Sequence, residues 1–444
     1  MGDVFITDGL AYVLLALVGS IGFVIWFFAR RYMRGDRRYT VFMRLIPLLY
    51  GCVSVGIFAN YFLLYLLAWA AANGILVYLM MHDPQWKASQ QSAKWAFRNF
   101  GVSLSFIALS FFIFWYLTHA WGIGSALKAL QGNHHTLVWV ALVLLILGAL
   151  SQSAVYPFHR WLISSVNAPT PVSAMMHAGL VNGGGFVLIR FSPLLKEYPL
   201  LLNLLFIVGM GTALMGTLWE LIEHDNKRMI ACSTVSQMGF MVAQCGMGLF
   251  GFALVHMVWH GLFKAYLFLV SGSVARDRRV TPFKFGRVSA FLALCVGFWG
   301  SFVFAFASQR IWGSPYTDTL MMMIVGVACA QFSLELLENH PIKYLPKTLF
   351  LTALVSGLYG VFANSIHALP EVKRLDVPIL LNGVYVLGAG LLMVMWALMA
   401  SRHWWQHKRP HFFAKAYVAA LNKAQPYPDT VTTSHLDYPW KDVL

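Results

Sequence analysis

Three titratable side chains occur at intervals of four residues in the apolar stretch LVHMVWHGLFKAYLFL, residues 254–269. They are His256, His260 and Lys264. Because an α-helix turns once in about 3.6 residues, this spacing places all three on one stripe of a helix. Histidine titrates near neutral pH, and a buried lysine loses its proton readily. The stripe therefore predicts a path along which a proton moves in short steps; the alternative is a structural polar network that holds helices together.

The composition indicates that this helix lies in a membrane. Of the 444 residues, 59% are hydrophobic and 11% are charged, and the mean hydropathy is +0.65. Apolar runs of about 20 residues, the length that crosses a bilayer as a helix, recur along the chain. We predict an all-α, polytopic transmembrane bundle of about 13 helices, with spans near 8–28, 41–59, 61–81, 98–118, 137–157, 171–193, 200–221, 229–248, 250–272, 288–308, 318–337, 348–366 and 378–400.

The net charge of +15 is explained by topology and does not indicate nucleic-acid binding. With the N-terminus outside, most of the 32 lysines and arginines fall in cytoplasmic segments, including 30–38, 276–287 and the tail after 400. Such a bias is the positive-inside rule, and anionic lipid headgroups would attract the excess charge. We expect a multi-pass protein of the bacterial inner membrane with a cytoplasmic C-terminus.

Motifs of soluble enzymes are absent from the sequence. It has no Walker A sequence, no HExxH and no GxGxxG after a strand, and its five cysteines form no CxxC pair. We expect these cysteines to be free and buried, and we expect no cofactor, metal site or enzymatic chemistry in this chain. The run VNGGGF, 181–186, lies in an apolar span and indicates close helix packing or a weakened helix.

Prolines predict a break in the helices near His177. Pro157 should end one helix, and Pro169 and Pro171 should begin the next, which carries His177. A broken helix within a membrane frees backbone groups and is tolerated where it lines a cavity. By itself, His177 fits a structural role better than a functional one.

Two further charged side chains have alternative interpretations. Glu220 is either solvated near the end of its span or part of a proton path. Arg190 either extends toward the membrane surface or pairs with a carboxylate.

The chain divides into a transmembrane region, 1–400, and a tail, 401–444. The first helix lacks a basic n-region and a cleavage site before it, so we expect it to be retained. The first half of the tail can form an interfacial amphipathic helix, whereas its PYPDT segment cannot. The tail is therefore expected to be a membrane-surface anchor or a docking segment for a cytoplasmic partner.

Three motifs, in this order, closely resemble the antiporter-like subunit family. That family includes the large proton-pumping membrane subunits of respiratory NADH dehydrogenase and the large subunit of Mrp-type sodium/proton antiporters. The resemblance covers about residues 10–300 and implies a core with two inverted five-helix repeats, broken helices and a line of buried Lys, His and Glu. The motifs are SQSAVYPFHRWLISSVNAPTPVSAMMHAGLV (151–181), HDNKRMIACSTVSQMGFM (224–241) and HMVWHGLFKAYLFLVSGSV (256–274).

The resemblance also assigns residues. Lys264, His260 and His256 match the central proton-relay helix of the family. His177 matches the histidine that follows its PTPVSA motif, and Lys227 matches the lysine of its D-x-K-R motif. Glu220 stands where the pumps usually have a small apolar residue, and is expected to be an additional member of the path.

Two positions depart from the pumps. Ala70 stands where they have a glutamate, and Gln152 stands where they have a lysine. That pair drives one half-channel of a pump, and both partners are replaced together, because removing one would leave a buried charge unpaired. The chain also lacks two leading helices and the long lateral helix of the pumps. This reduced form resembles the membrane subunit of DAB-type inorganic-carbon uptake systems.

The resemblance implies a membrane energy-coupling subunit. It would conduct H⁺ or Na⁺ so that a large cytoplasmic partner, a zinc protein related to carbonic anhydrases, hydrates CO2 to bicarbonate. The zinc is expected in the partner. The first alternative is an ion-translocating subunit of a respiratory or hydrogenase complex or of a multi-subunit cation/proton antiporter. The second is a scaffold that retains unused channel residues.

Overall fold

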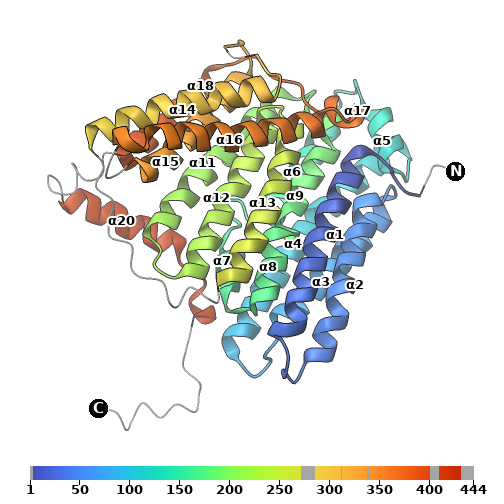
Figure 1. Cartoon of the computed structure of the whole chain (residues 1–444). Coiled ribbons are helices and arrows are strands. Elements are labelled where there is room, and N and C mark those ends of the chain that lie inside the picture. Colours follow the sequence, from blue (N-terminus) through green and yellow to red (C-terminus); the bar gives the residue numbers. More distant parts are fainter. Residues whose placement is uncertain (1–3, 272–285, 312, 338–340, 401–409, 432–444) are drawn as a thin grey trace, which may run out of the picture.

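The structure is a computed structural model that describes residues 4–271, 286–311, 313–337, 341–400 and 410–431. Its regular secondary structure is helical, as predicted, and Figure 1 shows two groups of helices. The basic segment 276–279 and the end of the third motif lie outside the described residues.

The first group of helices stands upright and contains the predicted stripe (Figure 1). Its outer members pack one face toward the core, while α8 and nearly all of α9 are buried among them. They are α1 (Gly9–Tyr32), α2 (Tyr39–Phe58), α3 (Phe62–Met80), α4 (Lys87–Thr118), α6 (Thr136–Gln152), α8 (Thr170–Ala178), α9 (Gly183–Arg190), α11 (Pro199–Ile222), α12 (Asn226–Gly246) and α13 (Phe250–Val270).

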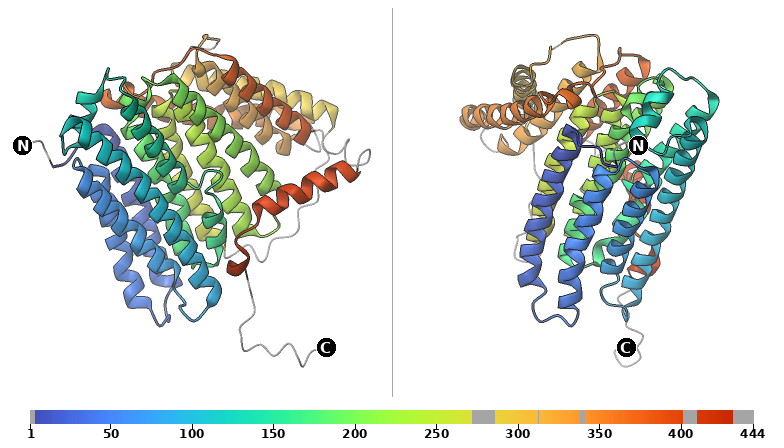
Figure 2. Two further views of the ribbon diagram at one scale, coloured as in Figure 1. Left: turned by 180° about the vertical axis from the view of Figure 1, so that it is seen from behind. Right: turned by 90° about the vertical axis from the view of Figure 1, so that its right-hand side faces the viewer.

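The second group follows the stripe in the chain and lies across one end of the upright helices. Figures 1 and 2 show it crossing them at a steep angle, which apolar length alone did not predict. Helix α14 packs on α15 and α16, while α16 reaches α13 and α18 reaches α11. Its members are α14 (Arg287–Ala307), α15 (Thr317–Leu336), α16 (Pro341–His367) and α18 (Gly383–Ala400).

Many of these helices are suited to a bilayer. Ten stretches of the described chain are long and apolar enough to cross a membrane, and the helices Thr136–Gln152 and Gly383–Leu398 are apolar but shorter. The expected span 229–248 exists as α12 but is not among the ten. Short helices connect the long ones: α5 (Ile123–Leu130), α7 (Arg160–Ser164), α10 (Ser192–Leu195) and α17 (Pro370–Lys373). The protein is therefore a multi-pass membrane protein.

The predicted break before His177 is present and begins earlier than expected. Helix α6 ends at Gln152, five residues before Pro157. The backbone of Ala154 has a φ of 52°, in the left-handed region, which an α-helix cannot continue through. The Ser153 hydroxyl donates to the backbone oxygen of Val181, 2.8 Å away, where the chain is interrupted again between α8 and α9.

Glycines let α9 approach its neighbours closely, as the VNGGGF run predicted. A Cβ atom on Gly184 would lie 2.1 Å from the backbone oxygen of Ala149 on α6. A Cβ atom on Gly185 would lie 2.4 Å from the sulfur of Met241 on α12. Larger side chains at these positions would push the broken helix away from its two neighbours.

The basic segment 30–38, which the sequence analysis assigns to the cytoplasm, includes the connection from α1 to α2 at one end of the upright group. There, His82 hydrogen-bonds Asp36 at 3.0 Å. Burial raises the pKa of Asp36, but the hydrogen bonds from His82 and from the backbone of Arg38 outweigh it, so the pKa lies below its usual value. At the opposite end, Arg190 pairs with Asp8, which confirms the pairing alternative for this arginine.

The tail returns to the upright group at the same end as Asp36. Helix α20 (Pro410–Ala424) leads to Tyr427, whose ring stacks on Trp95 at a centroid distance of 3.7 Å. The guanidinium of Arg160 lies 4.4 Å from the same ring, and the Tyr427 amide donates to the Ser164 hydroxyl at 2.9 Å. The PYPDT segment thus docks on this chain itself and forms only one 3-10 turn, Pro428–Thr430.

The five cysteines are free, and two of them, Cys232 and Cys245, are buried. Cys295 is exposed, so the prediction that all five are buried was wrong. Cys295 lies on α14, whose neighbouring Phe291 and Phe298 are also exposed. An apolar residue on an outer face of a membrane helix therefore does not report burial inside the protein.

We expect Gly184→Ala to lower the free energy of unfolding in detergent by about 1–3 kcal/mol, because the added methyl overlaps the backbone of α6. Gly211→Ala is the matched control, since nothing lies within 4 Å of a Cβ atom there. That change should be neutral or stabilise the helix by up to about 1 kcal/mol. Chemical denaturation followed by tryptophan fluorescence measures both; equal effects of the two variants would contradict the close approach.

Candidate functional site

The stripe predicted from the sequence lies along one face of α13 inside the protein. The exposed fractions are 8% for His256, 5% for His260 and 1% for Lys264. The rings of the two histidines face one another with centroids 5.9 Å apart. A charged group in such a place needs a partner or a water-lined route, because insertion of a lysine at a membrane helix centre costs about 2.5–3.5 kcal/mol.

His260 joins the continuous helix α13 to the broken helix α8. Its Nε2 donates to the backbone oxygen of His177, 3.1 Å away. His177 is fully buried and stacks on Phe268 at 4.3 Å. Its Nδ1 lies 3.1 Å from the hydroxyl oxygen of Thr234 on α12. Three helices thus meet at His177.

Thr234 closes the connection to Lys264. The hydroxyl of Thr234 and the Nζ of Lys264 both donate to the backbone oxygen of Ile230, at 3.0 and 3.3 Å. Hydrogen bonds to the backbone oxygens of Ile230 and His177 therefore gather Lys264, Thr234, His177 and His260 into one buried polar cluster. Sequence reasoning missed Thr234, although the polar run CSTVSQ in an otherwise apolar stretch was a signal for it.

In the stripe and its neighbour His177, two imidazole nitrogens are free to accept a proton. The hydroxyl of Thr234 already donates to a carbonyl, so His177 donates through Nδ1 and keeps an unshared pair on Nε2. That Nε2 and the Nε2 of His256 are buried without a protein partner. His256 bonds the backbone of Gln237 through its other nitrogen.

A cavity of about 650 Å³ lies beside the stripe. It separates α13 from α15 and α16, and its wall contains His256, His260 and Lys264. Ser233 and Gln237 of α12 add polar groups, while most of the remaining lining is apolar. This space was not predicted, because it forms only where the second group of helices meets α13.

Glu220 and Lys227 occupy different places relative to the stripe. Glu220 is partly buried on α11, where it attracts the charge of Lys264 and interacts with the Ser233 side chain. Lys227 instead donates to the backbone oxygens of Ala168 and Val166, at 3.3 and 3.5 Å. It therefore binds the chain just before α8 and lines a polar cavity of about 520 Å³ at the basic end of the bundle.

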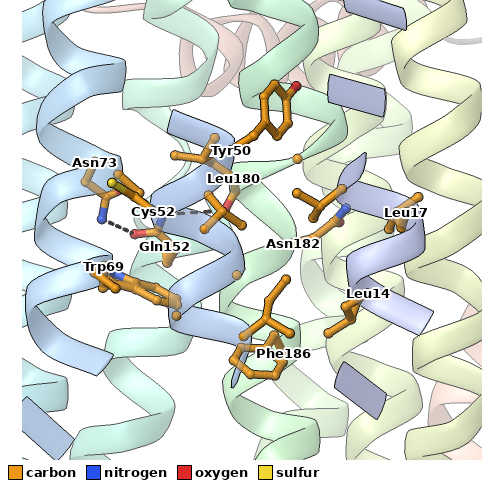
Figure 3. Close-up of a pocket in the computed structure, with 18 of the residues that line it drawn as sticks. Leu14, Leu17, Tyr50, Cys52, Trp69, Asn73, Gln152, Leu180, Asn182 and Phe186 are labelled. Atoms are coloured by element: carbon orange, nitrogen blue, oxygen red, sulfur yellow. Dashed lines mark hydrogen bonds between the residues drawn. The ribbon is translucent and has the colours of Figure 1, made fainter. Parts of the chain in front are cut away.

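Gln152, which the sequence analysis aligns with a lysine of the pumps, forms a neutral pair with Asn73. Figure 3 shows Gln152 facing Asn73, with its Nε2 3.1 Å from the Oδ1 of Asn73. The same nitrogen lies 3.4 Å from the backbone oxygen of Leu180. Asn73 and Gln152 line a cavity of about 80 Å³. Ala70, the other position singled out in the sequence analysis, does not line it. Asn73 was missed because it lies one helical turn beyond the glutamate position.

The donor sets give no support for a metal centre. Across the ranges that the structure describes, no group of three or more His, Cys, Asp or Glu side chains is placed to hold a metal ion. The site brings together groups that can hold and release protons: imidazoles, an ammonium group and a hydroxyl lie on α8, α12 and α13, and the carboxyl group of Glu220 on α11 interacts with Lys264.

A buried Lys–His stripe beside broken helices in an all-α bundle defines an antiporter-like membrane subunit. Comparison with known families agrees: residues 59–337 match the family described as "NADH:quinone oxidoreductase/Mrp antiporter, TM". This chain belongs to that family.

Relatives fall into several functional groups. A "Probable inorganic carbon transporter subunit DabB" of Bacillus subtilis (strain 168) is 37% identical over 62% of this chain and 54% of its own length. The "NADH-quinone oxidoreductase subunit L" of Escherichia coli (strain K12) is 34% identical over 61% of this chain and 44% of its own. The chain spans about half the length of such curated relatives.

The fold also occurs in solved structures. One chain of the "Structure of Mrp complex from Dietzia sp. DQ12-45-1b" aligns with 95% of this chain and 45% of its own length. The TM-score is 0.58 and the sequence identity is 21%, so this likeness concerns the fold.

We expect Gln152→Leu to lower the free energy of unfolding by about 1–3 kcal/mol, because it leaves the buried Asn73 amide unpaired. The double variant Gln152→Leu with Asn73→Leu should recover most of that loss, since neither polar group remains. Denaturation in detergent of the wild type, both single variants and the double variant forms a thermodynamic cycle. Additive losses would show that the two side chains are not coupled.

Proposed function

We propose that this chain is the energy-coupling membrane subunit of an inorganic-carbon uptake complex. It lets protons, or Na⁺, flow inward through the stripe of α13, and this flow drives a cytoplasmic partner that hydrates CO2 to bicarbonate. The observation that carries the proposal is the buried cluster of Lys264, Thr234, His177 and His260, which is held together by hydrogen bonds to the backbone oxygens of Ile230 and His177. Similarity to inorganic carbon transporter subunits supports the choice of reaction.

Each residue has its own role in moving the proton. His256 and His177 each present an unshared pair on Nε2 that accepts a proton. His260 connects them through its ring contact with His256 and its bond to the His177 backbone. Lys264 holds the proton farthest along the stripe, and Glu220 stabilises its charged form. Lys227 keeps the broken segment before α8 in place at the basic end.

The neutral Asn73–Gln152 pair favours one path through the protein. An ion pair at this place would supply a charge that responds to protons arriving elsewhere; two amides do not titrate. The cavity beside the pair is also far smaller than the cavity beside the stripe, about 80 against 650 Å³. A neutral pair beside a small cavity and a charged stripe beside a large one suggest a single path. This fits simple ion conduction that drives a partner better than a pump in which two halves change charge in turn.

Membrane potential can drive the reaction. Moving one charge across 100 mV yields about 2.3 kcal/mol, which shifts an equilibrium more than tenfold. The hydration chemistry is assigned to a large zinc-bearing partner related to carbonic anhydrases, so this subunit itself is not an enzyme. It resides in the bacterial cytoplasmic membrane with the N-terminus outside, and the basic end with the docked tail faces that partner.

A second candidate is an ion-translocating subunit of a respiratory complex or of a multi-subunit cation/proton antiporter. The similarity to subunit L of NADH-quinone oxidoreductase and the fold shared with the Mrp complex favour it. The neutral pair at Gln152 weighs against it, because a charged pair at this place belongs to the pump pattern. A scaffold role would leave the buried charge of Lys264 without a purpose.

Lys264→Arg and Lys264→Ala should each abolish growth at air-level CO2 of a bicarbonate-dependent host that expresses the chain with its partner. Alanine removes the proton-carrying group, and arginine keeps the charge but does not release its proton at physiological pH. The control Lys343→Ala changes an exposed lysine and should grow normally.

Each of these strains must contain comparable amounts of the complex in the membrane. Full growth of both Lys264 variants would refute proton transfer through Lys264. Growth of the arginine variant alone would assign Lys264 a fixed electrostatic role and would refute the step in which it releases a proton.

Purification of the complex in mild detergent should recover a large cytoplasmic protein in stoichiometric amount, with bound zinc. The reason is the proposed division of labour, in which the partner carries the zinc site that hydrates CO2 and this subunit conducts the ion. Mass spectrometry and elemental analysis identify the partner and its metal. Recovery of small antiporter subunits or iron–sulfur proteins would instead establish the second candidate.

A further inference from the structure

A cluster of buried charged side chains lies at the start of α13, at the opposite end of the stripe from Lys264. Its centre is Asp376, whose side chain is 3% exposed. The carboxylate accepts from the backbone amide of Gly251 at 2.6 Å, from Arg310 at 2.9 Å and meets the Nε2 of His367 at 2.5 Å. These partners come from α13, from the segment after α14 and from the end of α16.

The hydrogen bonds of His367 require a shared proton. Its Nδ1 lies 2.7 Å from the backbone oxygen of Ala363, which can only accept. Its Nε2 faces the carboxylate of Asp376, and that group also accepts when ionised. Both contacts are satisfied only if one extra proton resides on the pair, on the imidazole or on the carboxyl group. Geometry alone thus makes His367 and Asp376 a proton-holding site.

This pair continues the line of the stripe. Phe252 lies four residues before His256, on the same face of α13, and is buried. The ring of His367 packs on Phe252 with centroids 4.7 Å apart. Along the line from Lys264, the groups are therefore His260, His256, an apolar ring and then the proton-holding pair. One helical turn, about 6 Å of rise, separates Phe252 from His256.

The neighbouring charges fix the pair in place. Arg310 also donates to Asp318 at 3.3 Å and lies over the ring of Phe252 at 5.1 Å. Cys245 of α12 also interacts with Asp376. Glycine is required at 251, because a Cβ atom there would lie 2.6 Å from the Nε2 of His367.

We propose that His367 and Asp376 form the outer port of the proton path, with Phe252 as an apolar barrier between the port and His256. This inference rests on the proposed function. The pair passes its shared proton inward to Nε2 of His256 and is then reprotonated from the outer aqueous phase. The step moves a proton alone: an N–H or O–H bond breaks at the port, an N–H bond forms on His256, and no electrons are transferred.

The test measures proton flux into vesicles that contain the complete complex, under an imposed potential. Asp376→Asn preserves the shape of the side chain and removes the shared proton, so flux should fall about tenfold or more. Asp318→Asn is the comparison variant, because Asp318 also binds Arg310 but acts on His367 and Asp376 only through its charge. It should reduce flux less than Asp376→Asn, since both members of the proton-holding pair remain.

Two further variants keep the test decisive if Asp376→Asn fails to assemble. His367→Gln keeps an amide toward Asp376 but carries no proton, and it should reduce flux like Asp376→Asn. Phe252→Ala removes the barrier and should speed the decay of an imposed pH gradient across the vesicle membrane. Normal flux in His367→Gln, or an unchanged decay in Phe252→Ala, would overturn the port.

Lys264→Arg separates failure of the port from failure of the function. If it blocks flux while Asp376→Asn and His367→Gln do not, the path exists and protons enter it elsewhere. If all three variants conduct normally, the proposed function itself fails. Infrared difference spectra recorded against pH add a readout besides transport: a carboxyl or imidazole band should disappear in Asp376→Asn and persist in Asp318→Asn.

Discussion

The hydrogen bond from His260 to the backbone oxygen of His177 is the contact on which the proposed path depends. His177 lies in the last turn of α8, where backbone oxygens have no donor within the helix and can accept from a neighbouring helix. The interruption between α8 and α9 supplies such an oxygen, and the glycines of α9 let the break pack tightly against α6 and α12. Helix breaking and proton transfer are thus parts of one arrangement.

The sequence predicted what depends on local order along the chain. Four-residue spacing placed His256, His260 and Lys264 on one face, and prolines located the break before His177, although α6 ends five residues early. It could not predict contacts made between distant segments. Thr234 and Asn73 were missed for that reason, and so were the cavity beside α13 and the docking of Tyr427 on Trp95.

Buried polar groups at Gln152 and at Lys264 are stabilised in different ways. At Gln152 the chain uses two amides that satisfy one another, which avoids the desolvation of a charge. At Lys264 it keeps a charge that is 1% exposed and stabilises it with one backbone oxygen and the attraction of Glu220. Burying the charge of Lys264 is less favourable than burying the two paired amides. A buried charge that costs more than a satisfied pair of amides points to a use for Lys264.

The second group of helices adds what the antiporter-like core lacks alone. The family match ends at residue 337, yet His367 and Asp376, which meet the start of α13, come from beyond it. Apolar contacts between α16 and α13 hold these groups where the stripe ends, next to Phe252. In the proposed path, the later segment therefore supplies the groups at one end, outside the part of the chain that matches the family. Conduction can then be controlled at that end without altering His260 or Lys264.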